Sequence, residues 1–452
     1  MVEAGCWKRL EAQRRAERGR GRKPELKIKE LIGSLVYHGT MESGNLEQHV
    51  EELTGKRLSG AALSEWRQGL PWQLFEKIAA HVLRPLSHRR KHPQGFYKGL
   101  RLLALDGTGM SANNVPRILK KWLKTSSRRF KAAFAKVRMV LLVEVGMHNP
   151  VGVCIGPRQE SEHALGWEVA QKLPSGSLVM GDRLYGMPEF VGGMLARCLE
   201  VGSHFLVRVR KNLIMRMIEE LKDGSAIVEI KIRASGEKGG WFRFWVREIR
   251  GVVRDRSGKR IPIRLWTSLL NARKYPAQEL LALYFQRWEM ETTIREMKIT
   301  LYGGDRLRSK TVETACQEIL ALVLAMSMLA RARSQAAACS QLAPLCISFR
   351  QTLRYVRVLW LALSALSHRF TNRQIPGVIN DFIRKMSRCH SPPRRNHSCP
   401  RAVRQPVSSW RRLIRRTRCL TAERHRSLSY SGGGIQLAEH PRQEGAGQAS
   451  WM

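Results

Sequence analysis

Residues 276–304, PAQELLALYFQRWEMETTIREMKITLYGG, carry the pattern that decides the fold of this 452-residue chain. A proline at the start and two glycines at the end predict a helix of about seven turns. Four side chains with useful chemistry fall at offsets of 0, 3, 7 and 14 residues: Tyr284, Arg287, Glu291 and Lys298. At about 100° per residue these four share one narrow stripe. One edge of the helix is thus predicted to present a carboxylate flanked by a phenol and two cations.

A second, apolar stripe runs beside the first and consists of Leu283, Met290, Ile294, Met297 and Leu301. Together the stripes predict a helix that lies on a protein core while its polar edge offers a metal ligand and phosphate contacts. A solvated charged face is the alternative, because Glu and Arg or Lys at helical spacing commonly pair with each other. The spacing alone leaves both interpretations open.

The charge of the chain points to a polyanionic partner. Its hydrophobic (43%) and charged (26%) fractions are ordinary for a folded protein, but Lys+Arg 79 against Asp+Glu 37 gives a net charge of +42. A chain this basic repels itself unless it meets a polyanion, and nucleic acid is the leading candidate. An anionic membrane is the weaker candidate, because no basic amphipathic helix lies beside a lipidation signal.

Cysteine content and hydropathy predict a soluble, cytoplasmic protein. The nine cysteines are scattered and odd in number, which suits a reducing compartment. The basic N-terminus lacks the apolar segment of a secretory signal. The most apolar run, residues 319–330, is too short to span a bilayer and is interpreted as a buried helix.

Residues 96–210 alternate between strand and helix patterns and predict a mixed α/β domain. A short strand at 102–105 ends at Asp106, and there follow a hairpin (137–145 and 151–155), a helix (162–173), a strand (177–180) ending at Asp182, a helix (188–200) and a strand (204–210). Ligands of such sheets bind beyond the carboxyl ends of strands. Because an unpartnered core aspartate is costly, two aspartates at strand ends predict a shared, exposed site.

Asp106, Asp182 and Glu291 are therefore three carboxylates from three elements that could face one end of a sheet. Phosphoryl transfer on nucleic acid uses such a cluster to hold two Mg²⁺ or Mn²⁺ ions. Without metal, clustered carboxylates would raise each other's pKa, and a bound ion removes that penalty.

The flanking segments have less specific patterns. Residues 53–78, LTGKRLSGAALSEWRQGLPWQLFEKI, could form a helix-turn-helix with Gly60 or Gly69 at the turn, or a plain helical packing domain. The predicted domains are 1–30, basic and flexible; 31–95, helical and DNA-end-binding; 96–210, first part of the core; 211–268, a β-rich insertion; 269–310, the Glu helix; 311–390, C-terminal helices that are buried over 311–332 and 353–366; and 391–452, an Arg/Pro-rich disordered tail.

The helix matches Y-x-x-R-x-x-x-E-x-x-x-x-x-x-K without a gap, and LLALDGT (102–108) and GDRLYG (181–186) precede it. With these motifs the chain resembles the insertion-sequence-4 family of DDE transposases. LSGAALSEWRQGLPWQLF is similar to the family's N-terminal domain, and RRNHSCPRAVRQPV resembles its basic C-terminal end. The resemblance covers residues 30–412.

The resemblance implies an RNase H-like core with a β-strand insertion before the Glu helix. It implies that Asp106, Asp182 and Glu291 hold two Mg²⁺ (or Mn²⁺) ions. Tyr284, Arg287 and Lys298 would hold terminal phosphates and a displaced base, since Arg and Lys form charge-assisted hydrogen bonds to phosphate. The family also stacks a Trp of the insertion on a flipped base. The candidates for that role are Trp241, Trp245 and Trp266, and core packing explains each of them as readily.

Other features carry less weight. Cys389-His390 and His397-x-Cys399 have no familiar zinc spacing. Gly107-x-Gly109 lacks the Lys-Ser/Thr of a phosphate loop. A basic run is interpreted as a DNA-backbone surface, part of it simply solvated; it comprises Lys120, Lys121, Lys124, Arg128 and Arg129.

The predicted function is a DNA transposase that cuts the ends of its own element and transfers the freed strands into other DNA. The expected partners are double-stranded DNA, both terminal inverted repeats and target, and a second copy of the chain in a paired-end complex; no membrane is expected. In some family members a hairpin forms on the donor end. The alternatives are an inactive DNA-binding copy, which a patternless tail after Leu413 would suit, and another RNase H-like nuclease.

Overall fold

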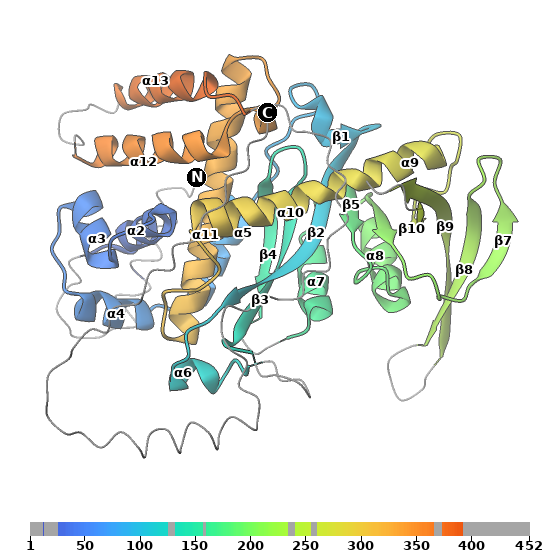
Figure 1. Ribbon diagram of the computed structural model, residues 1–452, viewed down its shortest axis with the longest axis horizontal. Coiled ribbons are helices and arrows are strands. Elements are labelled where there is room, and N and C mark those ends of the chain that lie inside the picture. Colours follow the sequence, from blue (N-terminus) through green and yellow to red (C-terminus); the bar gives the residue numbers. More distant parts are fainter. Residues whose placement is uncertain are drawn as a thin grey trace, which may run out of the picture. The chain divides into compact units, whose positions relative to one another are not determined.

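A ten-stranded mixed sheet runs through the described part of the protein (Figure 1). The computed structural model describes residues 26–124, 132–156, 160–233, 240–254, 260–365 and 373–391 together with Ala12, all within one compact unit. The strands are β1 (Phe96–Tyr97), β2 (Leu100–Ser111), β3 (Lys136–Glu144), β4 (Asn149–Ile155), β5 (Ser177–Gly181), β6 (His204–Arg208), β7 (Arg216–Glu220), β8 (Ala226–Arg233), β9 (Trp241–Arg254) and β10 (Arg260–Thr267). Across the sheet their order is β4-β3-β2-β5-β6-β10-β9-β8-β7, with β1 beside β2.

Strands β2, β5 and β6 run parallel at the centre of the sheet, and their neighbours on either side are antiparallel. The predicted hairpin and the predicted strand ending before Asp182 are confirmed. The predicted strand at 102–105 is too short, because β2 continues through Asp106 to Ser111. The parallel pairing with β5 ends at Leu105, but the antiparallel partner β3 extends further and keeps the chain in strand conformation. Asp106 thus lies within a strand, at the point where its parallel neighbour stops.

Residues 211–268 form four strands, so the predicted β content of this segment is confirmed. These strands extend the central sheet, because β10 pairs antiparallel with β6 over Leu265–Thr267. Strand β7 is the far edge of the sheet, and its side chains are exposed. Alternating hydrophobicity predicts the strands themselves but not their continuity with the core.

The side chains of β2 alternate between two hydrophobic cores, as the period of a strand requires. Leu103 and Leu105 pack with α7 (Glu162–Ala170) and α8 (Pro188–Glu200) on one face. Leu102 and Ala104 pack on the other face, which is covered by α9 (Ala277–Tyr284), α10 (Trp288–Arg295) and α11 (Val312–Cys339). In Figure 1 the continuous α9–α10 helix crosses the central strands.

Helix α11 packs against both the N-terminal and the C-terminal helices. The N-terminal helices α2 (Ile28–Thr40), α3 (Leu46–Thr54), α4 (Gly60–Gln68) and α5 (Trp72–Val82) and the C-terminal helices α12 (Phe349–Ala365) and α13 (Ile375–Ser387) share one hydrophobic core with it. Short helical turns complete the described elements: η1 (Pro93–Gly95), α6 (Pro116–Leu119) and η4 (Pro344–Cys346). Of the two turn glycines considered for a helix-turn-helix, Gly60 begins α4 and Gly69 caps its end.

The prediction of a buried helix over 319–330 is confirmed within α11. The helix has 28 residues and its most apolar window is 89% buried inside the protein, so although its length and composition would suffice to cross a bilayer, it is a core helix. The predicted second C-terminal helix is α12, which is less enclosed: Val358 is 49% exposed.

The opening segment is helical throughout but not uniform. Between α9 and α10 lies a 3₁₀ turn, η2 (Phe285–Arg287), and α10 continues into a π-helical segment, η3 (Glu296–Leu301). The prediction of one regular helix is therefore wrong in detail, and the four polar residues do not keep a strict 100° spacing. Short π-helical segments are frequent at functional sites. The apolar stripe is confirmed, because its members are buried or packed against the core.

Candidate active site

Strand register brings three polar residues to one level at the centre of the sheet. Leu105 pairs with Gly181, which in turn pairs with Val207. The next residues along the three parallel strands are Asp106, Asp182 and Arg208. Leu105 and Val207 face the α7/α8 core, so Asp106 and Arg208 face the opposite side, on which α10 lies. Parallel strands therefore place this group where ligands of α/β sheets bind.

The helix side of the site is connected to the strands through Arg287. Its Nη2 lies 3.1 Å from Oε1 of Glu291, and its Nη1 lies 3.7 Å from Oδ2 of Asp106. These side chains are only 14–17% exposed, so their charges are poorly solvated and depend on each other. The structure thus brings Asp106 of one sequence motif to Arg287 and Glu291 of another.

The pKa of Asp106 is raised to about 7, chiefly by burial and to a smaller extent by the nearby carboxylates Asp182 and Glu162, whereas Arg287 opposes the shift. In this environment the ionised form of the carboxyl group is energetically unfavourable. A cation close to the carboxylate would stabilise the ionised form. Carboxylates with a raised pKa are typical of functional sites, and structural ion-pair networks also shift pKa values.

Asp182, Tyr284 and Lys298 are held by contacts with the protein backbone. Oδ1 of Asp182 accepts the N–H of Leu184 at 2.8 Å. The Tyr284 hydroxyl donates to the carbonyl of Gly181 at 3.2 Å, and burial raises its pKa to about 12, which keeps it a neutral donor. Nζ of Lys298 donates to the Gly109 carbonyl at 2.6 Å. These bonds fasten the helix to β5 and β2. DNA contacts by Tyr284, Arg287 and Lys298 stay a prediction.

Glu162 is a fourth carboxylate that sequence patterns miss. It begins α7 behind the N-cap Ser161, and the Tyr185 hydroxyl donates to its Oε1 at 3.2 Å. A side chain at Gly107 would collide with Glu162, so the glycine after Asp106 gives it room to approach β2. Burial raises the pKa of Glu162, and Asp182 adds to the shift. An acidic residue in the first turn of a helix is common for electrostatic reasons, so its position in the sequence carries no functional signal.

Arg208 is the second residue that sequence patterns miss. Among the described residues, no hydrogen bond or ion pair holds its guanidinium, although the charge of Asp182 acts on it. Burial lowers its pKa. It is one of several basic residues in HFLVRVR, and only the parallel register of β5 and β6 distinguishes it from them.

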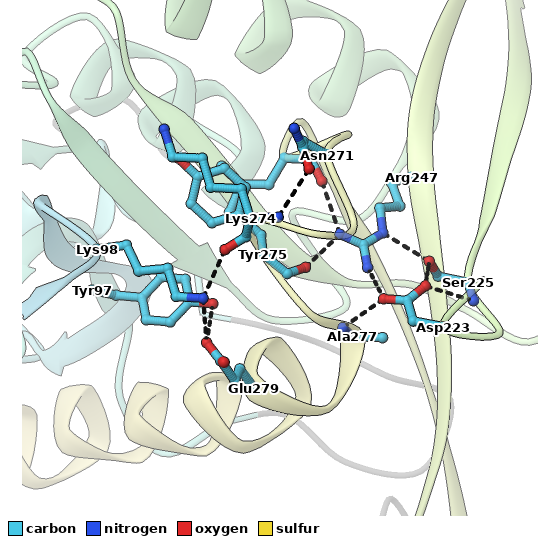
Figure 2. Close-up of polar contacts among 11 residues, drawn as sticks. Tyr97, Lys98, Asp223, Ser225, Arg247, Asn271, Lys274, Tyr275, Ala277 and Glu279 are labelled. Carbon is cyan, nitrogen blue, oxygen red and sulfur yellow. Dashed lines mark hydrogen bonds and ion pairs between the residues drawn. The ribbon is translucent and has the colours of Figure 1, made fainter. Parts of the chain in front are cut away.

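The start of α9 is anchored by a polar network around the buried Arg247 (Figure 2). Its guanidinium donates to the carbonyls of Tyr275 at 2.6 Å and Leu269 at 3.3 Å and pairs with Asp223 at 2.5 Å. Asp223 also accepts the N–H of Ala277, the first residue of α9, at 2.8 Å. The β7–β8 turn thereby fixes the beginning of the helix that carries Glu291.

A second anchor lies further along the same helix. His148, in the β3–β4 turn, is 1% exposed and sits between two carboxylates of the helix. Its Nε2 lies 2.8 Å from Glu289 and its Nδ1 lies 2.6 Å from Glu296. Because Glu289 and Glu296 flank Glu291 in sequence, this clamp limits how the polar edge of the helix can turn.

The site has the donors for a divalent metal but not the spacing. Carboxylate oxygens are the ligands that Mg²⁺ and Mn²⁺ prefer. Within residues 26–391 and outside their undescribed gaps, no three Asp, Glu, His or Cys side chains are gathered closely enough to hold one ion. Arg287 instead supplies the positive charge between Asp106 and Glu291. Metal binding would require Arg287 to leave and the carboxylates to converge.

The tryptophan candidates separate by burial. Trp266 is 1% exposed and donates its indole N–H to Glu248 at 2.8 Å, which marks it as a core residue. Trp241 and Trp245 are 60% and 58% exposed on β9. They alternate with Phe242 and Phe244, so they lie on the same face of β9 as Arg247 and α9.

The remaining candidates are only partly described. Cys389 and His390 contact backbone carbonyls of α13, while His397 and Cys399 lie outside the described residues. Lys120, Lys121 and Lys124 follow α6, and Arg128 and Arg129 lie outside the described residues. The six described cysteines are free thiols: Cys154, Cys198, Cys316, Cys339, Cys346 and Cys389.

Comparison with known proteins assigns the family. The transposase DDE domain matches residues 97–328, just over half of the chain. The transposase InsG of insertion sequence element IS4 from Escherichia coli (strain K12) is 24% identical over 394 residues, 85% of this chain and 86% of that protein. The piggyBac transposase in a synaptic complex with hairpin DNA, solved by cryo-EM, matches with a TM-score of 0.44 and 10% identity over 88% of this chain and 84% of its own. The chain belongs to the insertion-sequence-4 family of DDE transposases, so the resemblance is confirmed.

Proposed function

We propose that this transposase cuts phosphodiester bonds at the ends of its own element and transfers the freed strands into target DNA in a metal-dependent reaction. The observation that carries the proposal is that Asp106 and Asp182 follow paired residues of two neighbouring parallel strands, and that Arg287 connects Asp106 to Glu291 of the facing helix. Family membership and the net charge of +42 support DNA as the substrate.

Asp106, Asp182 and Glu291 would hold two Mg²⁺ or Mn²⁺ ions, which supply activation of the attacking oxygen and stabilisation of the leaving oxygen. Arg287 has a separate role. Its planar fork pairs equally well with carboxylates and with phosphate. An approaching phosphate would therefore give Arg287 a new partner. Asp106 and Glu291 would then each lose their contact with Arg287 and become free to bind metal.

Three further side chains, Lys298, Tyr284 and Arg208, would hold the terminal phosphates. Lys298 and Tyr284 lie on the same helix edge and now bond backbone carbonyls that DNA phosphates could replace. Arg208 stands beside Asp182 without a bonded partner among the described residues. We propose that it binds a phosphate of the same end.

The chain divides by role in this proposal. Residues 31–95 would bind the terminal inverted repeat, residues 96–210 and 269–310 would form an RNase H-like core, residues 211–268 an insertion that supports the start of α9, and residues 311–390 a helical support. The protein would act in the cytoplasm on chromosomal DNA. Because two ends must be joined, two copies of the chain would act together on paired ends.

An end-cleavage assay tests the proposal. A duplex that joins the terminal repeat to flanking DNA should be nicked to leave a 3′-hydroxyl in Mg²⁺ or Mn²⁺ but not in EDTA, and added target DNA should become covalently joined. The Asp182→Asn variant should bind the same duplex and cut nothing. Cleavage without joining would favour a nuclease, whereas binding without cleavage by the unaltered protein would favour an inactive copy.

A further inference from the structure

A basic pocket lies where the Glu291 helix ends. It has a volume of about 920 Å³, and its walls are the end of η3 with the loop after it, one side of α12, and the chain after α2. Five arginines line it, against the two carboxylates Glu42 and Asp305; the arginines are Arg306, Arg308, Arg350, Arg354 and Arg357. This charge is unlike that of the carboxylate cluster at the middle of the same helix.

Three of the five arginines serve the fold. Nη2 of Arg308 donates to the Met41 carbonyl at 2.8 Å, and Arg357 donates to the Thr40 carbonyl. Both therefore satisfy carbonyls at the end of α2, where cations are favourable. Nε of Arg306 donates to Asn113 at 3.1 Å.

The other two arginines have no such task. Arg350 and Arg354 are exposed, and in the part of the chain that the structure describes neither forms a hydrogen bond or an ion pair. They are four residues apart on α12, so they are neighbours on one face, and like charges at this spacing destabilise a helix. Leu353 between them is 2% exposed and fixes the orientation of this face toward the pocket.

We propose that this pocket binds the phosphodiester backbone of double-stranded DNA through Arg350 and Arg354. The two exposed guanidinium groups beside this pocket could bind a polyanion that spans it. Arginine forks bind phosphate oxygens in pairs and need no base sequence. The repulsion between the two arginines of α12 is offset once each of them binds a DNA phosphate.

The position of the pocket predicts which phosphates it holds, and this part rests on the proposed function. Thr300, in the pocket wall, is nine residues beyond Glu291, which corresponds to about 13 Å along the helix. At 3.4 Å per nucleotide along the duplex axis, that span is about four nucleotides. DNA cut beside Glu291 would therefore place phosphates about four nucleotides from the cleaved bond in the pocket.

Salt-dependent binding of an end duplex tests the site. The double variant Arg350→Gln/Arg354→Gln should bind more weakly, and its slope of log affinity against log salt should be smaller by about two, one for each lost phosphate contact. The matched control is Arg331→Gln/Arg388→Gln, which removes two exposed arginines outside the pocket. An unchanged slope in the α12 variant, or an equal loss in the control, would overturn the proposal.

Ethylation interference locates the contact and separates it from the catalytic assignment. In the unaltered protein, ethylation about four nucleotides from the cleaved bond should block binding, and in the α12 variant this effect should vanish. Both binding tests can be made with Glu291→Gln protein, which should not cut. If the salt slopes still differ but Glu291→Gln cuts normally, the pocket stands and the active-site assignment fails. Interference unchanged by the α12 substitutions would reject the pocket.

Discussion

The middle of the Glu291 helix and the basic pocket beyond its end differ in how their charges are satisfied. In the middle, Arg287 is enclosed with two carboxylates and contacts Glu291 at 3.1 Å and Asp106 at 3.7 Å. At the far end, Arg350 and Arg354 stand exposed beside an open pocket with no bonded partner among the described residues. In the proposed function the first group takes part in chemistry that depends on precise position, and the second in DNA contact that depends on charge. Substitutions in the two regions should therefore fail in different assays.

The largest effect is expected from Glu291→Gln. The substitution keeps the shape of the side chain but removes a proposed metal ligand, so end cleavage should fall about a thousandfold or more, equivalent to several kcal/mol of transition-state stabilisation. Affinity for the end duplex should change by less than about threefold, the opposite of the outcome for the α12 double variant. Single-turnover cleavage at saturating DNA, with Glu313→Gln on the exposed start of α11 as control, measures the difference. Normal cleavage by Glu291→Gln would remove it from the site.

Glu162→Gln should have an intermediate effect. Glu162 contacts Tyr185 and approaches β2 over Gly107, so it would position Asp106 and Asp182 from the opposite face of the sheet. Loss of such support typically lowers metal affinity or activity by about 10–100-fold. Titration of Mn²⁺ by electron paramagnetic resonance, alongside cleavage, separates positioning from general instability, and Tyr185→Phe should shift metal affinity in the same direction. Mn²⁺ affinity equal to that of the unaltered protein in both variants would make Glu162 purely structural.

A smaller effect concerns the stability of the metal-free protein. Because the pKa of Asp106 is raised to about 7 in the folded state, the folded protein holds a proton that the unfolded chain has already lost, and stability falls as pH rises from about 4 to about 7. Asp106→Asn cannot ionise and should unfold a few degrees higher than the unaltered protein at pH 8 in EDTA. That gain should disappear near pH 4. Thermal melts at both pH values check the sign, and a lower melting temperature for Asp106→Asn at pH 8 would contradict it.

The smallest effect concerns His38 of α2, which contacts the pocket residue Arg308. Here the change of stability with pH has the opposite sign. Burial lowers the pKa of His38 to about 3, and the charges of Arg308, His49 and Arg67 add to the shift. Below about pH 6.5 the unfolded chain binds a proton on this histidine, whereas folded His38 stays neutral. The contribution of His38 to stability is therefore present above pH 6.5 and is lost as pH falls. His38→Gln should lose less stability between pH 7 and pH 5 than the unaltered protein in urea titrations. Equal losses would show that His38 does not titrate there.

Sequence patterns predict the elements better than their connections. Short apolar runs identified β5 and the hairpin, and turn residues bounded α8, because these signals are local. The extension of β2 beyond Asp106 depends on β3, and the fusion of the insertion with the sheet depends on β10 meeting β6. Such pairings are set by tertiary contacts that no local pattern records.

The same division holds at the site. The three carboxylates could be proposed from strand ends and helix spacing. Glu162 and Arg208 could not, because a first-turn glutamate and a strand arginine are ordinary in any sequence and gain their meaning from register. The contact of Arg287 with both Asp106 and Glu291 also required the fold, since it joins residues 181 positions apart.

The central claim is that Asp106, Asp182 and Glu291 together hold the metal ions. Its most direct test counts Mn²⁺ bound to the protein in complex with an end duplex, by electron paramagnetic resonance, for the unaltered chain and for Asp106→Asn, Asp182→Asn and Glu291→Gln. We predict that the unaltered complex binds two ions and that each variant loses at least one while still binding DNA. Undiminished Mn²⁺ binding in all three variants would contradict the assignment.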